Sequence, residues 1–369
     1  MKTNWINRYL CFGLVFCSSL LGFSACGEDD DVEINKGQES LVEKAPIRDM
    51  VLIYTGGSHR YVTWDKEHFK PYVYLAKDTE TPQWLFDGFL FLELHDGNGY
   101  DFASFYGRKA ARKTEWITLV SNHLKPGNAI RALDDCIGEI KNSIPGPFTK
   151  RKVVMVLPEP IPNTKDWGQI GGKTLDFSIR EDRIEACKWY VDFAIKRFKL
   201  ANMENVQLCG FYWLAEEATN SRDMVKDIAL YIQQEKKLKF YWIPYYGSDG
   251  CYEWNRYGFD QAYLQPNHFF TETVPDSRID EAVSNARKYG MSLEMEFDAR
   301  ALKQYGWGKR MKAYIDRFES NGVFEKEDIA YYQGDDAFFL LKHSAHEEDN
   351  DLYYELAEKI ASRQKNTNK

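Results

Sequence analysis

The sequence predicts an α/β fold, a single-domain (β/α)₈ barrel in which parallel strands alternate with helices. Eight short apolar runs recur between residues 50 and 336, and stretches with apolar residues at three- and four-residue spacing lie between them. Strands that are buried on both faces are nearly continuous apolar runs of this kind. A doubly wound open sheet is the alternative, but its Gly-rich first turn has no counterpart in YTGGSHRYVTW (54–64), which contains no G-x-G-x-x-G.

Residues 1–26 are predicted to be a signal peptide that precedes the fold. Lys2 and Arg8 form a charged start, and the apolar stretch YLCFGLVFCSSLLGF (9–23) follows. The sequence FSAC (23–26) resembles the cleavage box of bacterial lipoproteins, with Phe23 where Leu is usual. The resemblance implies that Cys26 receives lipid and anchors the protein to a membrane. A plain cleaved signal with a chance cysteine is the alternative.

Residues 27–46 are predicted to be a polar, acidic tether between this anchor and the barrel. The run GEDDD (27–31) resembles the surface-export tag of Bacteroidetes lipoproteins, and a merely solvated linker is the alternative. The resemblance implies an outer-membrane lipoprotein that is exposed on the cell surface.

The barrel domain is expected over residues 47–365, with no linker inside it. Its predicted strands are MVLIYTG (50–56), GFLFLEL (88–94), VVMVLPEP (153–160), VQLCGFYWLAE (206–216), FYWIPYYG (240–247), AYLQPNHFF (262–270), SLEMEFD (292–298) and IAYYQGDD (329–336). Helical spacing is clearest at Ile130, Leu133, Ile137 and Ile140, at Ile184, Cys187, Val191, Ile195 and Phe198, and at Met311, Ile315 and Phe318. Gly290 and the pair Asn321 and Gly322 predict two helix ends. The segment from about 95 to 127 is long for one connection, so we expect an inserted helix there.

Composition excludes one class of partner and favours another. The formal net charge is −8 and the pI is about 5.5. Binding to nucleic acid needs a basic surface that neutralises phosphates, so no nucleic-acid partner is expected. Aromatic residues make up 15% of the chain, more than a core needs, and surplus aromatic side chains favour a binding surface that stacks on sugar rings.

The sequence predicts neither a cofactor nor a metal. Cys136, Cys187, Cys209 and Cys251 are too scattered for a disulfide framework, and buried free thiols are expected. There is no G-x-S-x-G elbow and no P-loop. The sequence HSAH (343–346) has a spacing that could hold a metal, but it lies in a polar run without H-E-x-x-H, so a solvated loop is expected.

Function is expected where the strands end, because the active sites of such barrels lie at the carboxyl-terminal face. The polar and aromatic residues near these ends are His59, His95, Asp96, Glu159, Asn163, Glu216, Glu217, Tyr245, Tyr246, Asp249, Asn267, His268, Glu296, Asp298, Arg300, Gln333, Asp335 and Asp336. Several carboxylates and aromatic rings around one mouth predict an acidic, aromatic-lined cleft that contains Tyr245 or Tyr246 and Asn267 or His268.

Alternation along the seventh strand selects one carboxylate. In SLEMEFD (292–298) the apolar residues alternate with Glu294 and Glu296, so both glutamates are expected to point into the barrel. Glu296 lies nearer the mouth, whereas Glu294 is expected to serve a supporting hydrogen bond or ion pair below it. On the fourth strand both faces are apolar, so alternation does not choose between Glu216 and Glu217.

The motifs GFYWLAE (210–216) and LEMEF (293–297) resemble those of the large clan of retaining glycoside hydrolases, which are barrels with a glutamate at the end of strand four and another near the end of strand seven. More closely, an exported lipoprotein with these motifs resembles a Bacteroidetes family of glycoside-hydrolase-like barrels of undefined activity. The resemblance implies that Glu216 is the acid/base and Glu296 the nucleophile, with Ala215 where the clan usually has Asn. It implies a carbohydrate substrate and no particular sugar.

Several further residues are candidates for substrate binding. Trp213, Tyr245, Tyr246 and Trp167 are candidate stacking faces, Arg300 is a candidate donor or cation beside the nucleophile, and His95, Asp96, Glu159, Asn267 and His268 are candidate polar contacts. A surface-anchored glycan-binding barrel without catalysis is the alternative function, because a fold alone does not establish an activity.

Overall fold

The computed structural model describes residues 46–77 and 80–367. The predicted signal peptide, Cys26 and all but the last residue of the predicted tether lie outside these ranges. None of the helices within them has the length and hydropathy that a membrane span requires.

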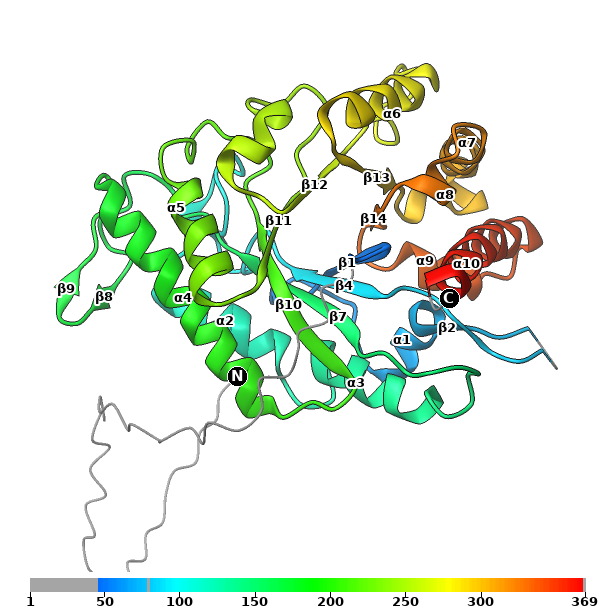
Figure 1. Cartoon of the computed structure of the whole chain (residues 1–369), viewed down its shortest axis with the longest axis horizontal. Coiled ribbons are helices and arrows are strands. Elements are labelled where there is room, and N and C mark those ends of the chain that lie inside the picture. The colour runs from blue at the N-terminus through cyan, green and yellow to red at the C-terminus, as the bar shows by residue number, and fades with distance from the viewer. Residues whose placement is uncertain (1–45, 78–79, 368–369) are drawn as a thin grey trace, which may run out of the picture. The chain divides into compact units, whose positions relative to one another are not determined.

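Eight parallel strands close into a barrel in chain order (Figure 1). They are β1 (Asp49–Tyr54), β4 (Gly88–Leu92), β7 (Arg151–Leu157), β10 (Val206–Trp213), β11 (Lys239–Trp242), β12 (Gln261–Leu264), β13 (Ser292–Glu296) and β14 (Ile329–Tyr332). The first strand pairs with both β4 and β14, which closes the ring. Each predicted strand coincides with one of these eight, so the predicted (β/α)₈ barrel, or TIM barrel, is confirmed.

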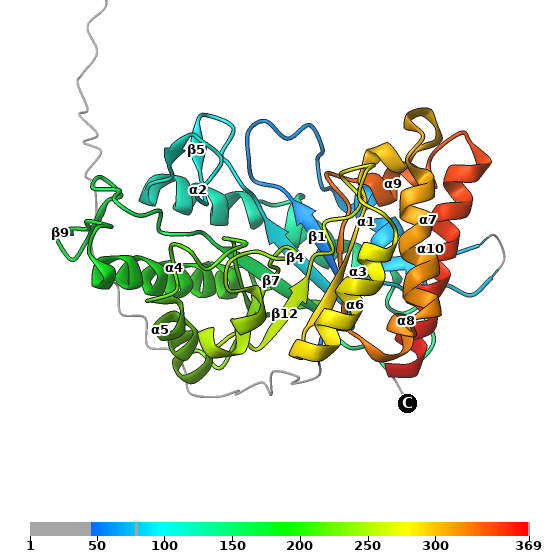
Figure 2. The ribbon, with the colours of Figure 1, turned by 90° about the horizontal axis from the view of Figure 1, so that it is seen from above.

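Helices surround the barrel (Figures 1 and 2). They are α1 (Lys66–Val73), α2 (Lys113–His123), α3 (Ala129–Ile140), α4 (Arg180–Ala201), α5 (Val225–Leu230), α6 (Ser277–Tyr289), α7 (Gly308–Ser320), α8 (Val323–Lys326), α9 (Ala337–Lys342) and α10 (Glu347–Thr367). The helix expected between residues 95 and 127 is α2. Gly290 has a left-handed φ of 66° directly after α6, where a residue with a Cβ would be strained, and so ends that helix as predicted.

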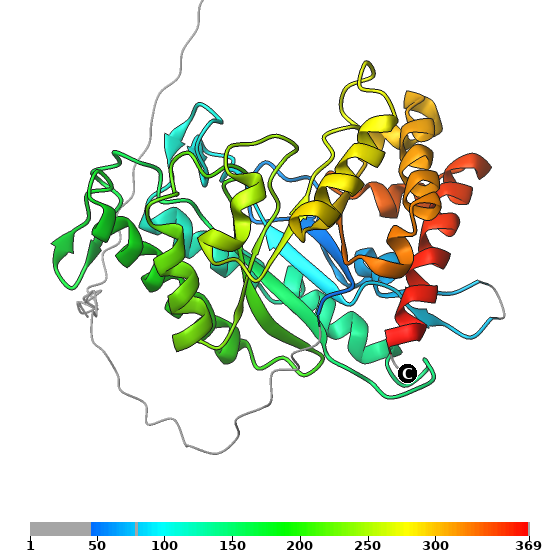
Figure 3. The same ribbon diagram turned by 45° about the horizontal axis from the view of Figure 1, so that its top comes forward.

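Three small two-stranded sheets lie in the loops between the barrel strands and helices. They are the pairs β2 (Tyr74–Leu75) with β3 (Gln83–Trp84), β5 (Tyr100–Asp101) with β6 (Lys109–Ala110), and β8 (Gln169–Ile170) with β9 (Lys173–Thr174). The β8/β9 pair projects away from the barrel (Figures 1 and 3). Strands of two residues carry no detectable alternation, so the sequence analysis did not predict them.

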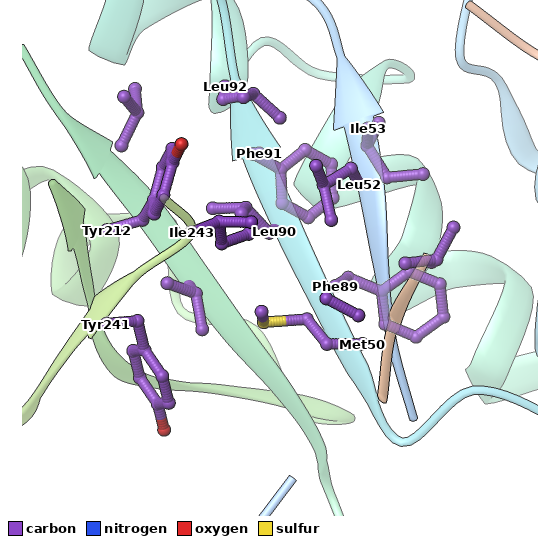
Figure 4. Packing of buried hydrophobic residues seen from close by; sticks show 14 of the residues in the cluster. Met50, Leu52, Ile53, Phe89, Leu90, Phe91, Leu92, Tyr212, Tyr241 and Ile243 are labelled. Carbon is purple, nitrogen blue, oxygen red and sulfur yellow. The ribbon is translucent and has the colours of Figure 1, made fainter. Parts of the chain in front are cut away.

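The core has an inner and an outer layer that follow from strand alternation. Leu52, Leu90, Tyr212 and Ile243 gather inside the barrel, whereas Phe91 points to the other face of its strand (Figure 4). The four cysteines in the described part of the chain, Cys136, Cys187, Cys209 and Cys251, are buried free thiols, as expected.

Candidate active site

A cavity of about 360 Å³ opens at the carboxyl-terminal ends of the barrel strands. Seven of the strands, or the residues that directly follow them, line it: Leu52, Tyr54, Leu94, Tyr212, Glu216, Ile243, Tyr245, Gln265, Asn267, Phe270, Glu294, Glu296 and Tyr332. A second cavity of about 340 Å³ lies beside β3 and the end of α10, but no carboxylate lines it. Acidic and aromatic side chains meet at the first cavity, which is therefore the candidate active site.

Glu216 enters this cavity from the end of β10. It is half-buried, and its Oε1 accepts a hydrogen bond from Gln265 Nε2 at 3.0 Å. Burial raises the pKa of Glu216, and the neighbouring charge of Glu217 raises it further, although the Gln265 hydrogen bond opposes the shift. A carboxyl group in this setting keeps its proton to a higher pH than a free glutamate does.

The adjacent Glu217 is directed elsewhere. Its Oε2 accepts a hydrogen bond from Tyr245 Oη at 2.8 Å, and it does not line the cavity. The structure therefore separates the two glutamates that strand alternation left undecided: Glu216 faces the cavity, and Glu217 holds a tyrosine of its wall.

Glu296 enters from the end of β13, as its alternation predicted, and is 1% exposed. Its Oε2 accepts hydrogen bonds from the backbone N–H of His268 at 3.2 Å and from Tyr314 Oη. Its Oε1 has no hydrogen-bond partner among the described residues. Burial raises the pKa of Glu296 to about 7, although both donors favour the ionised form.

Tyr314 comes from α7, in the outer helical layer, and sequence reasoning missed it. The residue is fully buried, and its spacing from Met311 and Phe318 is that of a core residue. No sequence signal distinguishes a tyrosine that fills the helix layer from one whose hydroxyl reaches a strand end.

Glu294 also lines the cavity and is 2% exposed. Its side chain makes no hydrogen bond or ion pair within the described residues, so the predicted supporting contact is wrong. Burial, and then the charges of Glu296 and Glu216, raise the pKa of Glu294 well above its usual 4.5. Three carboxyl groups thus share one cavity and influence one another electrostatically.

A charged cluster lies beside the cavity, at the ends of β1 and β4. Buried Glu93 accepts hydrogen bonds from Arg60 Nε at 2.7 Å and Nη2 at 2.6 Å, and Arg60 also pairs with Asp335. The Arg60 guanidinium lies 4.9 Å from the ring centroid of Tyr54, which lines the cavity. Burial opposes ionisation of Glu93, but Arg60 outweighs it and lowers the pKa. No sequence pattern indicated a role for Arg60 or Glu93.

Some predicted binding residues lie at the rim. The half-buried His95 ring stacks on His59 with centroids 4.5 Å apart, and burial lowers the pKa of His95. Asp96 accepts hydrogen bonds from the backbone N–H groups of Asn98 and Tyr100, so it shapes its own loop.

The structure places other predicted contacts away from the cavity, because their side chains have partners in the layers around it. Trp213 is 1% exposed and packs near Phe240, and Trp167 is equally buried against Trp116. These two positions leave no ring face for a sugar, which corrects the prediction that they stack.

The remaining predicted contacts belong to local networks. Tyr246 reaches Glu281 on α6, the buried His268 ring pairs with Asp276, Arg300 pairs with Asp298 and lies over Trp307, and Glu159 accepts from the backbone of Ser104. None of these four residues lines the cavity. Arg300 does not touch Glu296; the backbone N–H of His268 and the hydroxyl of Tyr314 take the place that Arg300 was expected to fill.

Within residues 46–77 and 80–367, no three His, Cys, Asp or Glu side chains converge as metal ligands would. His343, from the HSAH sequence, stacks on Phe339 instead.

The fold and the site together define a parallel barrel with an acidic, aromatic-lined cavity at its carboxyl-terminal mouth. Residues 49–358 match the family described as a domain of unknown function (DUF4855), and the chain belongs to that family. No curated protein matches the sequence.

Three solved structures are similar to this chain at low sequence identity. One of two fungal β-1,4-galactanases has 10% identity and a TM-score of 0.36, over 62% of this chain and 83% of that chain. A mutant tryptophan synthase α-subunit from Pyrococcus furiosus has 11% identity and a TM-score of 0.36, over 84% and 96%. The xylanase-α-amylase inhibitor protein XAIP-I, in complex with trehalose, has 10% identity and a TM-score of 0.37, over 86% and 98%.

Proposed function

We propose that the protein is a retaining glycoside hydrolase that acts on a polysaccharide or glycan, with Glu216 as acid/base and Glu296 as nucleophile. The observation that carries the proposal is that Glu216, from the fourth barrel strand, and Glu296, from the seventh, line one cavity and are coupled electrostatically. Retaining hydrolysis needs two carboxyl groups about 5–5.5 Å apart, and the rigid ends of strands can hold such a spacing.

The environments of the two groups suit different roles. The Glu216 proton passes to the glycosidic oxygen as the C–O bond to the leaving group breaks, while a Glu296 oxygen forms a bond to the anomeric carbon. Water then attacks that carbon as Glu216 takes up its proton, and the bond to Glu296 breaks, which frees the sugar. Burial raises the pKa of Glu216, which favours its protonated form. Burial also raises the pKa of Glu296 to about 7, but the His268 N–H and the Tyr314 hydroxyl favour its carboxylate, which is the form that attacks.

Substitution of the two glutamates tests the assignment. Glu296→Ala should abolish turnover of every substrate. Glu216→Ala should lower kcat by about 10²–10⁴-fold on poor leaving groups and far less on activated aryl glycosides, which need little protonation. A panel of aryl glycosides with leaving groups of graded pKa gives both measurements.

Glu217→Gln is the matched control, because it lies next to Glu216 and keeps an acceptor for Tyr245. Its activity should remain near that of the wild type. A leaving-group dependence in Glu217→Gln but not in Glu216→Ala would reverse the assignment.

Binding without hydrolysis is the second candidate, and one observation favours it. Glu296 is 1% exposed and is tied to the helical layer by Tyr314, as a structural carboxyl group would be. This candidate predicts that wild-type protein retains a glycan without cleaving it and that Glu296→Ala leaves retention unchanged.

We further propose that the chain is a lipoprotein of the outer membrane, exposed at the cell surface and anchored through Cys26. The FSAC sequence after the apolar stretch supports this proposal. Cys26→Ser should move the protein from the membrane to the soluble fraction on cell fractionation, whereas unchanged membrane retention would contradict lipidation.

A further inference from the structure

Three large aromatic side chains stand exposed on loops at the mouth of the barrel. Tyr61, after β1, is 73% exposed, and Phe105 and Tyr106, between β5 and β6, are 71% and 40% exposed. These two loops rise on the same side of the barrel (Figure 2). Single exposed apolar residues are common and need no explanation, so each position requires independent support.

Tyr106 lies beside His95 at the rim, with the two ring centroids 6.4 Å apart. Burial raises the pKa of Tyr106, and the charge of Glu216 raises it further. Part of the ring remains open to a ligand that leaves the cavity on this side.

Phe105 is held in an unfavourable backbone conformation. Its φ is 79°, in the left-handed region that a residue with a Cβ adopts only at a cost in free energy. No aromatic ring within the described residues lies against Phe105, and its own ring is mostly in solvent, so packing does not offset that cost. Strain at an exposed aromatic residue is a feature typical of functional positions.

Tyr61 extends the same arc of the rim. Burial raises its pKa to about 12, and the charges of Asp336 and Asp335, which follow β14, raise it too. Asp335 pairs with Arg60, which lies over the cavity residue Tyr54. Because β14, β1 and β4 are neighbours in the barrel, Tyr61 and the loop of Phe105 flank one side of the mouth.

We propose that Phe105 and Tyr106, with Tyr61 beside them, form a stacking platform for an extended, neutral glycan chain of which one unit occupies the cavity. The proposal rests on the proposed function and adds its substrate class. A ligand that reaches both the cavity and the platform must be longer than a single sugar. The carboxyl groups of Glu216, Glu294 and Glu296, with no Lys or Arg among the residues lining the cavity, disfavour an acidic sugar.

Two variants test the platform against an exposed apolar control. Phe105→Gly removes the ring and relieves the positive φ, and Tyr106→Ala removes the neighbouring ring. Leu200→Ala is the control, because Leu200 is 68% exposed at the end of α4. Each is measured by affinity electrophoresis in the neutral polysaccharides glucan, mannan, xylan and galactan and in the acidic polysaccharide polygalacturonate, and by turnover of an aryl monoglycoside.

We expect wild-type protein to be retained by at least one of these neutral polysaccharides and each platform variant to bind it about tenfold more weakly, the effect of losing one aromatic contact. Leu200→Ala should bind polysaccharide and turn over the aryl monoglycoside as the wild type does. Each platform variant should lose more on polysaccharide than on the monoglycoside, and Phe105→Gly should not lower the melting temperature.

Four outcomes overturn the platform: no retention of the wild type, retention by acidic polysaccharides alone, undiminished binding by stable Phe105→Gly, and an equal loss on the monoglycoside. Failure of the proposed function has another signature. Glu216→Ala and Glu296→Ala would then leave all turnover unchanged, while Phe105→Gly would still weaken retention on polysaccharide.

Discussion

At the scale of single residues, Glu294 and Glu93 show how opposite environments act on buried carboxyl groups. Glu294 has no hydrogen bond within the described residues, and its pKa is raised by burial and by two neighbouring glutamates. Glu93 is equally buried, but hydrogen bonds and charge from Arg60 lower its pKa. The free energy of unfolding should therefore depend on pH in opposite directions through the two groups.

The direction of each pH dependence follows from whether the folded or the unfolded state binds more protons. Above pH 4.5, the usual pKa of glutamate, the unfolded chain has released the Glu294 proton that the folded protein still holds, so stability falls as pH rises. Glu294→Gln should remove this loss, with a gain of up to about 1.4 kcal/mol per pH unit above pH 4.5. Urea unfolding between pH 4.5 and pH 8 measures it, and a gain that did not grow with pH would contradict the argument.

Glu93→Gln should change the free energy of unfolding in the opposite direction from Glu294→Gln. It removes the buried carboxylate that accepts two hydrogen bonds from the half-buried Arg60 and leaves Arg60 its pair with Asp335, which costs about 1.5–3 kcal/mol at neutral pH. The loss should shrink as the pH falls below 4.5 toward the lowered pKa of Glu93, because the wild type then loses the same ionic interaction. The same urea series measures this variant, and a loss that stayed constant with pH would show that packing dominates.

Part of the candidate site could be predicted from sequence because it depends on strand alternation. Glu294 and Glu296 were placed in the barrel by the alternation of SLEMEFD, and both line the cavity. The hydrogen bond from Tyr314 and the pair of Arg60 with Glu93 could not be predicted. Each joins residues from different elements, and no local pattern records such a contact. The roles of Glu216 and Glu296 in catalysis stay a prediction.

At the scale of elements, helix α7 contacts both the end of the seventh strand, β13, and the loop between β12 and α6. Tyr314 bonds to Glu296, and Arg310, one turn earlier, donates hydrogen bonds to the carbonyl oxygens of Phe269 at 3.0 Å and Thr271 at 2.9 Å, among others. Residues four apart lie on one helix face. The helical spacing of this segment was predicted correctly, but an arginine on its buried face was not.

The Arg310 contacts predict a specific loss of stability. Arg310→Lys should lower the free energy of unfolding by about 2–3 kcal/mol, because a single ammonium cannot replace a guanidinium that serves several carbonyl groups. Arg317→Lys, on the same helix in a half-exposed pair with Asp280, should cost less than about 1 kcal/mol. Urea unfolding compares the two, and equal losses would show that the loop contacts contribute little.

Strand β10 shows why a motif can be predictive for two reasons at once. A Cβ at Gly210 would lie 2.4 Å from the backbone oxygen of Lys239, so the glycine in GFYWLAE is required by close packing against β11. The aromatic residues after it fill the barrel and its outer layer, and the run then ends in Glu216 at the mouth. Most residues of the motif are therefore required for packing, and only its last residue, Glu216, lies in the candidate active site.

At the scale of the whole molecule, the regular recurrence of apolar runs predicted a closed barrel. It did not indicate which side-chain contacts stabilise the closure between the first and last strands. Asp49, at the start of β1, is fully buried and accepts hydrogen bonds from Arg363 Nε on α10 at 2.7 Å and from Tyr331 Oη on β14 at 2.8 Å. These contacts join residues about 280 or more positions apart. The first strand, the last strand and the last helix therefore share one buried charge network.

This network predicts that the ends of the chain are coupled to the stability of the entire barrel. Asp49→Asn should lower the free energy of unfolding by about 3–5 kcal/mol, because it removes the carboxylate from a buried ion pair. The double variant Asp49→Asn with Arg363→Met should recover part of that loss, since it removes the buried guanidinium charge as well. Glu355→Gln is the control: its pair with Lys312 joins α10 to α7 at a half-exposed position and should contribute less than about 1 kcal/mol.

Urea unfolding followed by tryptophan fluorescence and by circular dichroism measures all three variants, and the two probes should report one coincident transition if the barrel unfolds as a unit. A double variant less stable than Asp49→Asn would show that Arg363 stabilises the closure through its backbone acceptors on Phe324 and Glu327 rather than through Asp49.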